Sequence, residues 1–413
     1  MIMIRRWKEV KLGDLIKISH GFNFQSEFFS NEPTPRILIT PANFKRGGGF
    51  NGSRFKYYND TGFCPIPVSR SSGLEYILNP GDIIVALTDI SHEGCILGCS
   101  ARVPTIEDKI FLHNQRIGKI SVISEDLSPR FLYWLLRTYQ YRKHVLNYAS
   151  NTTVRHTSPS VIKAYRFYLP SKEQQEAIAT LLDLLESQIV LLEEGNQKYE
   201  DTIMNLCGWF FKKVRKTAPL SDFGRIICGK TPSTAVRHYF DGKIPFIKIP
   251  DMRNRVFVTS TDDTLTPEGA ATQKNKQIPP HSLCVSCVAT VGLVTMTSEL
   301  SFTNQQINSI LPHDRRYLYY LYCALKNEGM TRHLKFISKR GTATMCLNSK
   351  AFSEVRIPYP SKQQLQKFNE IAHRSFERIL IRIKKADLYI AMRDILLPRL
   401  MSGKLSFSRG TKQ

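Results

Sequence analysis

The chain has 413 residues, of which 42% are hydrophobic and 23% are charged; this composition is ordinary for a globular protein and excludes disorder or a collagen-like repeat as its overall description. At about 100–200 residues per domain, the length predicts two or three domains. Lys and Arg number 58 against 35 Asp and Glu, a net charge of +23, so a polyanion such as nucleic acid is the first partner to consider and an anionic membrane surface the second.

The chain begins MIMIRRWKEV, without an apolar run of signal-peptide length. The longest apolar stretch, residues 283–296, is interrupted by Ser and Thr and is too short to span a bilayer. Nine cysteines are scattered over the chain, which favours reduced thiols over a disulfide framework. We therefore expect a cytoplasmic protein without a membrane partner.

Residues 1–170 form the first predicted domain, with a net charge of +9. Strand-like runs such as residues 82–87 alternate here with Gly, Pro and Asn, which indicates a mixed α/β domain. Residues 47–52 fit the GxGxxG pattern, but no helix pattern follows, so no dinucleotide site is expected. Residues 45–58 are predicted to form a flexible loop of basic and aromatic residues that suits contact with DNA.

Residues 171–216 are predicted to contain a long spacer helix, of which about 40 residues would extend roughly 60 Å. Ser171 and Gln174 have the spacing of a capping box at its start. Apolar residues recur alternately every four and three positions, as in a coiled-coil seam. The seam consists of Ile178, Leu182, Leu185, Ile189, Leu192, Tyr199, Ile203, Leu206 and Phe210. Asn196 is its polar member, and either fixes the register or is a tolerated polar group near the surface.

Residues 217–360 form a second predicted domain of the same mixed kind, with a net charge of +8. Residues 224–231 match GxxxxGK[ST], but the loop is bulky and a proline follows it directly, which argues against a phosphate-binding loop. Cys284 and Cys287 lie in an apolar, strand-like stretch without a partner pair, which favours buried thiols over a zinc site. We expect no bound metal.

Residues 361–413 contain a second long helix and a C-terminal tail. Ser361 and Gln364 repeat the capping-box spacing, and Pro398 should kink or end the helix. Its seam consists of Ala372, Phe376, Ile379, Ile383, Ala386, Ile390, Arg393, Leu397 and Leu400. The net charge is −6 over residues 171–211 and +5 over residues 361–393, so the two helices are predicted to pair.

The two halves of the chain repeat each other. Pro-Ser-Lys at 170–172 recurs at 360–362, and Asn-Gln at 114–115 recurs at 304–305, both with an offset of 190. The opening KLGDLIKISHG at 11–21 corresponds to PLSDFGRIICG at 219–229. Collinear matches in one order indicate an internal duplication. The predicted fold class is α+β, with two tandem globular domains separated by two long coiled-coil helices in a pseudo-twofold repeat.

This arrangement resembles the specificity subunit of type I restriction–modification systems over nearly the whole chain. The resemblance is carried by the duplicated body, the two openings, IPFIKIPDM at 244–252, the Pro-Ser-Lys-x-Gln helix starts and the ending ILLPRLMSGKL at 395–405. It implies that residues 1–170 and 217–360 are target recognition domains, each reading one half of an asymmetric bipartite site in double-stranded DNA. It also implies that the two helices pack antiparallel and fix the spacer between the halves.

The resemblance further implies that this chain has no catalytic residues and binds no cofactor itself. Its expected partners are two methyltransferase subunits, which use S-adenosylmethionine to methylate adenine N6. Two restriction subunits, which use ATP and Mg²⁺, can join this complex in the family. In agreement, the sequence contains no methyltransferase signature such as NPPY.

Candidate DNA contacts are basic residues in stretches predicted as loops, because phosphates and guanine edges attract such side chains. They are Lys45, Arg46, Arg54, Lys56, Arg155, His156, Arg253, Arg255, Lys274, Lys276, Lys339 and Arg340. The repeated Asn-Gln pairs either contact DNA or hold the fold by hydrogen bonds. Two other functions remain open: a stand-alone nucleotide-binding enzyme and a coiled-coil nucleic-acid-binding adaptor.

Overall fold

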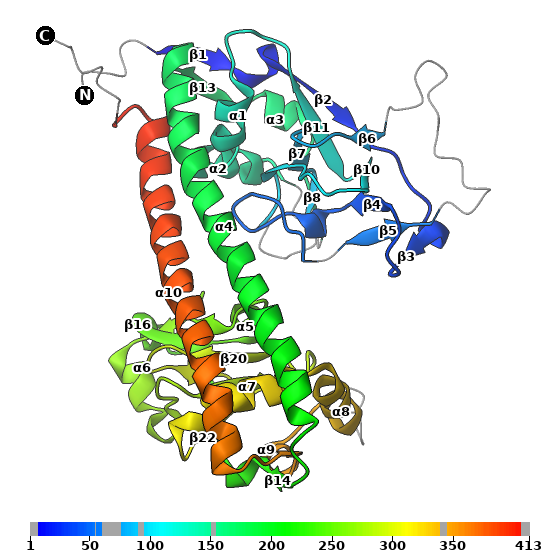
Figure 1. The fold of residues 1–413 in the computed structure, drawn as a ribbon. Helices are drawn as coiled ribbons and strands as arrows, with labels where there is room; N and C mark the ends of the chain where they lie inside the picture. The colour runs from blue at the N-terminus through cyan, green and yellow to red at the C-terminus, as the bar shows by residue number, and fades with distance from the viewer. Residues whose placement is uncertain are drawn as a thin grey trace, which may run out of the picture. The chain divides into compact units, whose positions relative to one another are not determined.

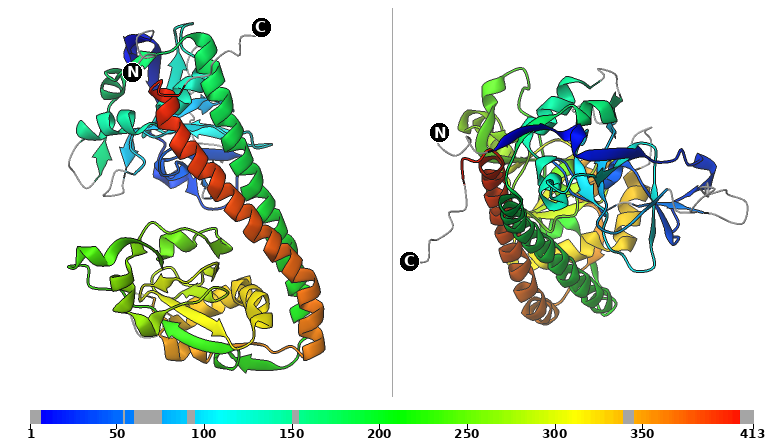
Figure 2. Two further views of the ribbon diagram at one scale, coloured as in Figure 1. Left: turned by 90° about the vertical axis from the view of Figure 1, so that its left-hand side faces the viewer. Right: turned by 90° about the horizontal axis from the view of Figure 1, so that it is seen from above.

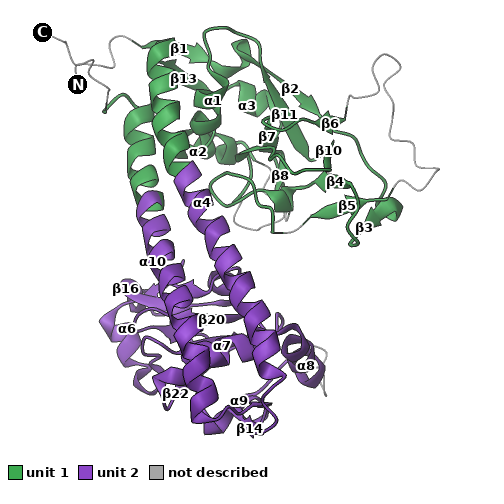
Figure 3. Cartoon of the chain, in the orientation of Figure 1, with its two compact units in different colours: residues 1–186, 390–413 green, residues 187–389 purple. Residues whose placement is uncertain are grey.

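The computed structural model describes residues 7–53, 55–59, 76–89, 95–149, 154–338 and 345–405. The chain divides into two compact units, shown in green and purple in Figure 3. Unit 1 comprises Met1–Glu186 and Ile390–Gln413, and unit 2 comprises Ser187–Tyr389. Both divisions fall inside long helices, so each unit consists of one globular domain and segments of two helices.

The first sheet of unit 1 is antiparallel and has the strand order β2-β11-β7-β9; Figure 1 labels its first three strands. Its strands are β2 (Ile16–His20), β11 (Ile117–Val122), β7 (Ile83–Ala86) and β9 (Ser100–Arg102). Successive side chains of a strand point to opposite faces, so Ile83 and Val85 join one hydrophobic core while Ile84 and Ala86 join another. This double burial explains why the sequence of β7 is apolar throughout.

The second sheet of unit 1 has the order β3-β5-β4-β10-β6 and includes a parallel pair, β4 with β10. Its strands are β3 (Phe29–Ser30), β5 (Lys56–Tyr58), β4 (Arg36–Ile39), β10 (Ile110–His113) and β6 (Ile77–Leu78). Two small pairs are β1 (Lys8–Lys11) with β13 (Arg166–Leu169), and β8 (Thr88–Asp89) with β12 (Arg155–His156). The helices are α1 (Pro129–Leu135), α2 (Tyr139–Asn147) and α3 (Pro159–Lys163).

Unit 2 repeats this plan with a smaller second sheet. The first sheet contains β15 (Gly224–Cys228), β22 (Ile307–Pro312), β19 (Leu283–Ser286), β20 (Val294–Thr297) and β17 (Phe257–Val258), in that order. The second contains β18 (Thr264–Leu265), β16 (Phe240–Ile247) and β21 (Phe302–Thr303), and β14 (Thr217–Pro219) pairs with β23 (Arg356–Pro358). The helices are α5 (Ile249–Met252), α6 (Pro267–Ala271), α7 (Leu318–Lys326), α8 (Glu328–Ser338) and α9 (Ser349–Ser353).

Duplicated sequence positions occupy equivalent places in the two units. Gly21 follows β2, and a Cβ added there would stand 2.1 Å from the carbonyl oxygen of His113. Gly229 follows β15, and a Cβ there would stand 2.3 Å from the carbonyl oxygen of Thr303. Only glycine permits such an approach of two backbone segments. The predicted α+β duplication is therefore confirmed at the level of single residues.

The two long helices are α4 (Lys172–Phe211) and α10 (Lys362–Met401), each of 40 residues. Both predicted capping boxes form. The backbone N–H of Gln364 donates to Ser361 Oγ over 3.2 Å, and the Ser361 N–H donates to Gln364 Oε1 over 2.9 Å. Ser171 and Gln174 exchange the same two bonds at 3.4 Å. Pro398 lies inside α10, which continues to Met401.

Within each unit, the segments of α4 and α10 lie side by side and run in opposite directions (Figures 1 and 2). In unit 2, Arg382 binds Asn196, and the rings of Phe368 and Phe210 lie 5.4 Å apart. In unit 1, Arg393 binds Glu186. Increasing numbers on α4 therefore meet decreasing numbers on α10, as the predicted antiparallel arrangement requires.

The predicted seam residues are buried or partly buried, with one exception. Those buried are Ile178, Leu182, Leu185, Ile189, Leu192, Ile203, Phe376, Ile379 and Leu397, and those partly buried are Tyr199, Ile383 and Ile390. The prediction that Leu206 belongs to the buried seam was wrong, because its side chain is 43% exposed and the neighbouring Cys207 is buried instead. An α-helix has 3.6 residues per turn, so a strict 3.5-residue repeat drifts around it.

Candidate nucleic-acid interface

Lys45 and Arg46 are exposed on a tight turn within the predicted loop. The N–H of Lys45 donates to the carbonyl oxygen of Gly49 over 2.9 Å, and the Gly49 N–H donates to Ser100 of β9 over 2.8 Å. These bonds tie the turn to the first sheet of unit 1. Residues 45–53 therefore form a loop, as predicted, and backbone hydrogen bonds that the composition does not reveal hold its tight turn.

The aromatic end of the same segment forms strand β5. Lys56 is exposed, and its Nζ lies 4.1 Å from the centre of the Phe29 ring, in a cation–π contact. Lys109 Nζ lies 6.0 Å from the centre of the Tyr57 ring. The surface of the second sheet therefore combines cations with aromatic rings. Arg54 lies outside the described residues.

Arg155 and His156 form strand β12, not the predicted loop. In the antiparallel register of β12 and β8, Arg155 lies opposite Asp89. Arg155 is half-buried, while His156 is exposed. The Nδ1 atom of His156 lies 3.1 Å from the hydroxyl of Thr88. These two residues are thus positioned by the edge of a small sheet.

The unit 2 candidates are spread over two segments. Arg253 is exposed just after α5, and Arg255 is half-buried, its Nη1 donating to the carbonyl oxygen of Ser260 over 2.8 Å. Lys274 is exposed and Lys276 half-buried in one turn of 3₁₀ helix. Lys339 and Arg340 lie outside the described residues.

The repeated Asn-Gln pairs form matching turns in which the two residues have different roles. Asn114 Oδ1 accepts the N–H of Arg116 over 2.9 Å, and Asn304 Oδ1 accepts the N–H of Gln306 over 3.1 Å. Both asparagines are buried, so they hold the turn. The glutamines that follow them are exposed.

Each exposed glutamine is oriented by a second side chain. Gln115 Nε2 donates to Asn23 Oδ1 over 2.8 Å, and the Thr231 hydroxyl donates to Gln305 Oε1 over 2.7 Å. Sequence reasoning missed Asn23 and Thr231. Their signal was their place just after the duplicated glycines, which pack against these turns.

The segment that matches a nucleotide-binding loop is not a phosphate cradle. Residues 224–228 are strand β15, and the next regular element is a 3₁₀ turn at Arg237–Tyr239, not an α-helix. The N–H groups of Gly229 and Lys230 donate to the carbonyl oxygens of Ile307 and Thr303 over 3.1 and 3.0 Å. They are therefore occupied by the fold, whereas such a loop must direct its N–H groups at phosphate.

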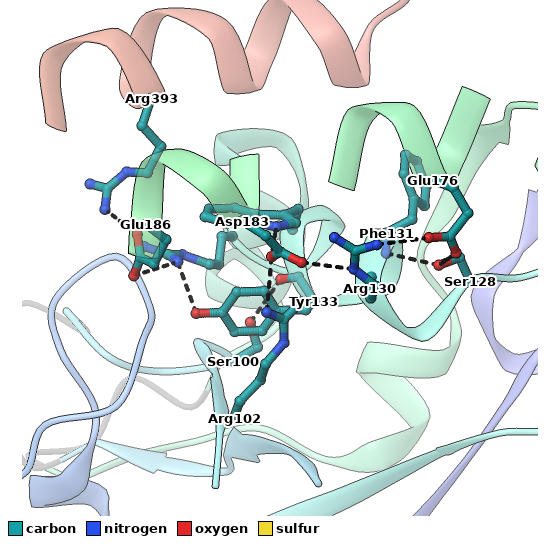
Figure 4. A network of polar contacts seen from close by, with 12 residues as sticks. Ser100, Arg102, Ser128, Arg130, Phe131, Tyr133, Glu176, Asp183, Glu186 and Arg393 are labelled. Atoms are coloured by element: carbon teal, nitrogen blue, oxygen red, sulfur yellow. Dashed lines mark hydrogen bonds and ion pairs between the residues drawn. The ribbon is translucent and has the colours of Figure 1, made fainter. Parts of the chain in front are cut away.

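A network of ion pairs joins α4 to α1, β9 and α10 in unit 1 (Figure 4). Asp183 of α4 accepts bonds from Arg130 at 2.8 Å and from Arg102 at 2.9 Å. Glu186 accepts from Arg137 at 3.2 Å and from Arg393 of α10 at 2.9 Å. Burial raises the pKa of Glu186, but the two guanidinium groups outweigh it and hold that pKa below its usual value.

Unit 2 uses α4 in the same way with different groups. Glu200 of α4 is buried and binds both the Tyr322 hydroxyl and the Lys326 ammonium of α7. Among the described ion pairs, Glu186–Arg393 joins α4 to α10. The others involving α4 join it to β9, to α1 and the residues just after it, or to α7. The acidic residues of α4 thus mainly fasten the globular domains, not its partner helix as the net charges predicted.

Buried titratable groups near the duplicated turns have shifted pKa values. Burial lowers the pKa of His113 to about 4, and its Nε2 lies 2.9 Å from the carbonyl oxygen of Ile117. Burial raises the pKa of both Cys284 and Cys287 to about 12. In the described parts of the chain, no group of three or more His, Cys, Asp or Glu side chains is placed to hold a metal ion.

Residues 4–200 and 214–387 match the family described as "Type I restriction modification DNA specificity domain". The chain belongs to this family. Its two matched regions together contain the globular domains of both units and most of the two helices. The recognition that the repeats and helix starts suggested is therefore confirmed.

Individual relatives cover parts of the chain. The type I restriction enzyme HindI specificity subunit of Haemophilus influenzae is 47% identical over 198 residues, which are 48% of this chain and 42% of that protein. The MjaIX specificity subunit of Methanocaldococcus jannaschii is 30% identical over 161 residues, 38% of this chain and 36% of that protein. The chain thus spans less than half the length of these curated relatives.

The fold also matches a solved structure. The crystal structure of a type I restriction–modification S subunit from M. genitalium aligns over 96% of both chains with a TM-score of 0.53 and 16% identity. This likeness concerns the fold alone. Within the described residues, no helix is long and apolar enough to cross a membrane.

Proposed function

We propose that this chain is the non-catalytic DNA-recognition subunit of a type I restriction–modification complex, in which each unit reads one half of an asymmetric bipartite site. The observation that carries the proposal is the duplication: two units with equivalent first sheets and different second sheets, in a chain that belongs to the specificity family. Equivalent frames suit two half-sites of one duplex, and unlike second sheets suit different base sequences.

The surface chemistry supports this proposal. Exposed Lys45, Arg46 and Lys56 in unit 1, and Arg253 and Lys274 in unit 2, provide cations for phosphate contact. Exposed Gln115 and Gln305 offer amide groups that are held in one orientation. An excess of 23 positive charges would attract DNA at long range.

Partner subunits are the second part of the proposal. Large apolar side chains are exposed on both long helices, which is costly unless another protein covers them. They are Leu184, Met392 and Ile395 in unit 1, and Leu191, Leu206, Trp209, Ile371, Ile381 and Leu388 in unit 2. The proposed occupants are two methyltransferase subunits, which supply S-adenosylmethionine chemistry, with two ATP- and Mg²⁺-dependent restriction subunits as additional partners. Such a complex would act on cytoplasmic DNA.

A methylome tests the proposal directly. The chain is expressed with the methyltransferase subunit encoded beside it in a host without DNA methylation, and N6-methyladenine is mapped by single-molecule sequencing. We expect one asymmetric motif, two short halves around a fixed gap. Because adenine N6 is inaccessible inside a duplex, the partner must flip the base out. Absence of methylation by an assembled, purified complex would contradict the proposal.

The same experiment addresses the other two functions. The nucleotide-binding enzyme is opposed by the occupied N–H groups of Gly229 and Lys230. A coiled-coil adaptor for RNA or another polyanion would bind with strong salt dependence but give no bipartite DNA motif. The motif, not the salt dependence, therefore separates the adaptor from the proposed DNA-recognition subunit.

A further inference from the structure

We infer that Arg382 locks helix α4 at Gly195 and thereby restricts the chain to a single gap length between its two DNA half-sites. The inference rests on the proposed function, because it assigns the gap to particular residues of the spacer. All the contacts that carry it lie within unit 2.

The guanidinium of Arg382 reaches from α10 onto the backbone of α4. Its Nη2 donates to the carbonyl oxygens of Leu191 and Leu192 over 2.9 and 3.2 Å, and its Nε donates to Asn196 Oδ1 over 3.1 Å. In an α-helix these carbonyls also accept from residues 195 and 196. Arg382 therefore adds a second donor to two consecutive carbonyls, and its planar fork is suited to holding several acceptors at once.

Glycine at position 195 makes this contact possible. A Cβ added to Gly195 would stand 2.0 Å from Arg382 Nη2, closer than any side chain tolerates. Glycine is otherwise one of the least favourable residues inside a helix, because it exposes the backbone and loses the most conformational freedom. Its presence in the middle of α4 is thus accounted for by the arginine that fills the space.

At Gly195, helix α4 has both a residue at which it can bend easily and an arginine that holds it in place. Helices bend where glycine interrupts them or where a side chain enters the hydrogen-bond ladder. Arg382 binds the helical turn that ends at Gly195 and the side chain of Asn196. It therefore restrains bending at Gly195 and fixes the register of α10 against α4. Asn196 is then a register residue, one of the two roles that its place in the seam allowed.

A small bend would be enough to matter. Lys172 precedes Gly195 by 23 residues, or about 35 Å along a helix, so a bend of about 6° there moves the helix start by roughly 3.4 Å, the rise of one base pair. A spacer without the lock would therefore accept gaps that differ by one base pair from the natural gap.

The test uses the full chain in complex with its methyltransferase and plasmids that carry the mapped half-sites at the natural gap, one base pair shorter and one longer. We expect the unaltered complex to methylate the natural gap. In Arg382→Ala, the methylation rate at altered gaps relative to the natural gap should rise roughly tenfold, as loss of hydrogen bonds to a charged group allows. Gly195→Ala displaces the arginine but also removes the weak point of the helix, so it should raise the ratio less than Arg382→Ala does. Arg382→Lys should give an intermediate ratio.

Arg378→Ala is the matched control, because Arg378 is exposed one turn earlier on α10; it should leave the ratio unchanged. An assembled Arg382→Ala complex that keeps the natural ratio would overturn the inference while the proposed function stands. If Arg382→Ala does not assemble, Arg382→Met retains the packing of the stem; failure of both beside an intact Arg378→Ala would show a folding role and also overturn it. An unaltered complex without any bipartite motif would instead refute the proposed function.

Discussion

Unit 1 and unit 2 build different second sheets on first sheets that share four strands, to which unit 2 adds β17. In the described residues, β2-β11-β7-β9 corresponds to β15-β22-β19-β20, and each unit adds a second sheet with one parallel pair, β4–β10 or β16–β21. The second sheet has five strands in unit 1 and three in unit 2. The duplicated turns and glycines belong to the shared part, whereas the aromatic strand β5 and the turn that carries Lys45 belong to unit 1.

This difference divides each unit into a frame, the first sheet with the duplicated turns and glycines, and a variable surface, the second sheet with the segments beside it. The frame recurs with its buried asparagines, packed glycines and capped helices because the same packing and hydrogen bonds must be satisfied in both copies. A sheet that changes in size is free of those demands and can be adapted to a different sequence of bases. Under the proposed function, specificity should therefore reside in the second sheets and in the segments beside them.

The fastening of each globular domain to α4 should give the largest effects. Glu186→Ala removes the carboxylate that the partly buried Arg137 and Arg393 share, and Glu200→Ala removes the one shared by the buried Tyr322 and the partly buried Lys326. Breaking a fully buried pair on one side costs about 3–5 kcal/mol, and partial exposure of the cations places these pairs near the lower end, about 3 kcal/mol. We expect each substitution to lower the free energy of unfolding by that amount, with hydrogen exchange rising around α1 for Glu186→Ala and around α7 for Glu200→Ala.

Glu194→Ala is the control for both, since Glu194 is exposed on the same helix and should change stability by less than about 0.5 kcal/mol. If Glu186→Ala or Glu200→Ala changed stability as little as this control, the two carboxylates would not hold their domains to α4 in the same way. A loss of protection spread over both units would instead show that they unfold as one.

His113 should make one copy of the frame sensitive to acid. Thr303 occupies its place in the sequence repeat of unit 2. Burial lowers the pKa of His113 to about 4, so the folded state binds fewer protons than the unfolded state between that pH and about 6.5. The stabilisation is complete above about pH 6.5 and falls as the pH drops, by about 3 kcal/mol in total.

Urea unfolding of the full chain at pH 7 and pH 4.5, followed by hydrogen exchange at β10 and β11, measures this loss. His113→Thr should reduce the pH dependence at these strands, and His313→Asn, which alters an exposed histidine of unit 2, should leave it unchanged. An unaltered pH dependence in His113→Thr would mean that other groups cause it.

The repeat, the capping boxes and the seam were predictable because each follows from local spacing. Ser171 and Ser361 stand three residues before glutamines, and seam positions recur every three or four residues, so the physics of one helix determines them. The misplacement of Leu206 has the same origin: the heptad pattern was followed past the point where a straight helix departs from it.

The site was less predictable because its geometry depends on distant segments. Nothing near Gly195 in sequence indicates Arg382, which lies 187 residues later, although a glycine inside a strong helical pattern is itself a sign of close packing. Lys56 was placed in a loop because two- to four-residue strands have too few residues to show alternation. The basic residues remain predicted contacts, since exposure and charge are common to DNA-binding and ordinary surfaces.

The smallest expected effect concerns Gln115 and Gln305, and it sharpens the division into frame and surface. Because both glutamines lie on the shared turns, they should contact what the two half-sites have in common, the sugar–phosphate backbone. Gln115→Ala and Gln305→Ala should each weaken DNA binding by about 1 kcal/mol, the contribution of one hydrogen bond, for every sequence alike. Binding of the complex to the natural site and to single-base variants measures this, with Gln366→Ala, on the exposed face of α10, as the control. Relaxed discrimination at a single base would contradict the expectation, because it would mean that the frame itself reads sequence.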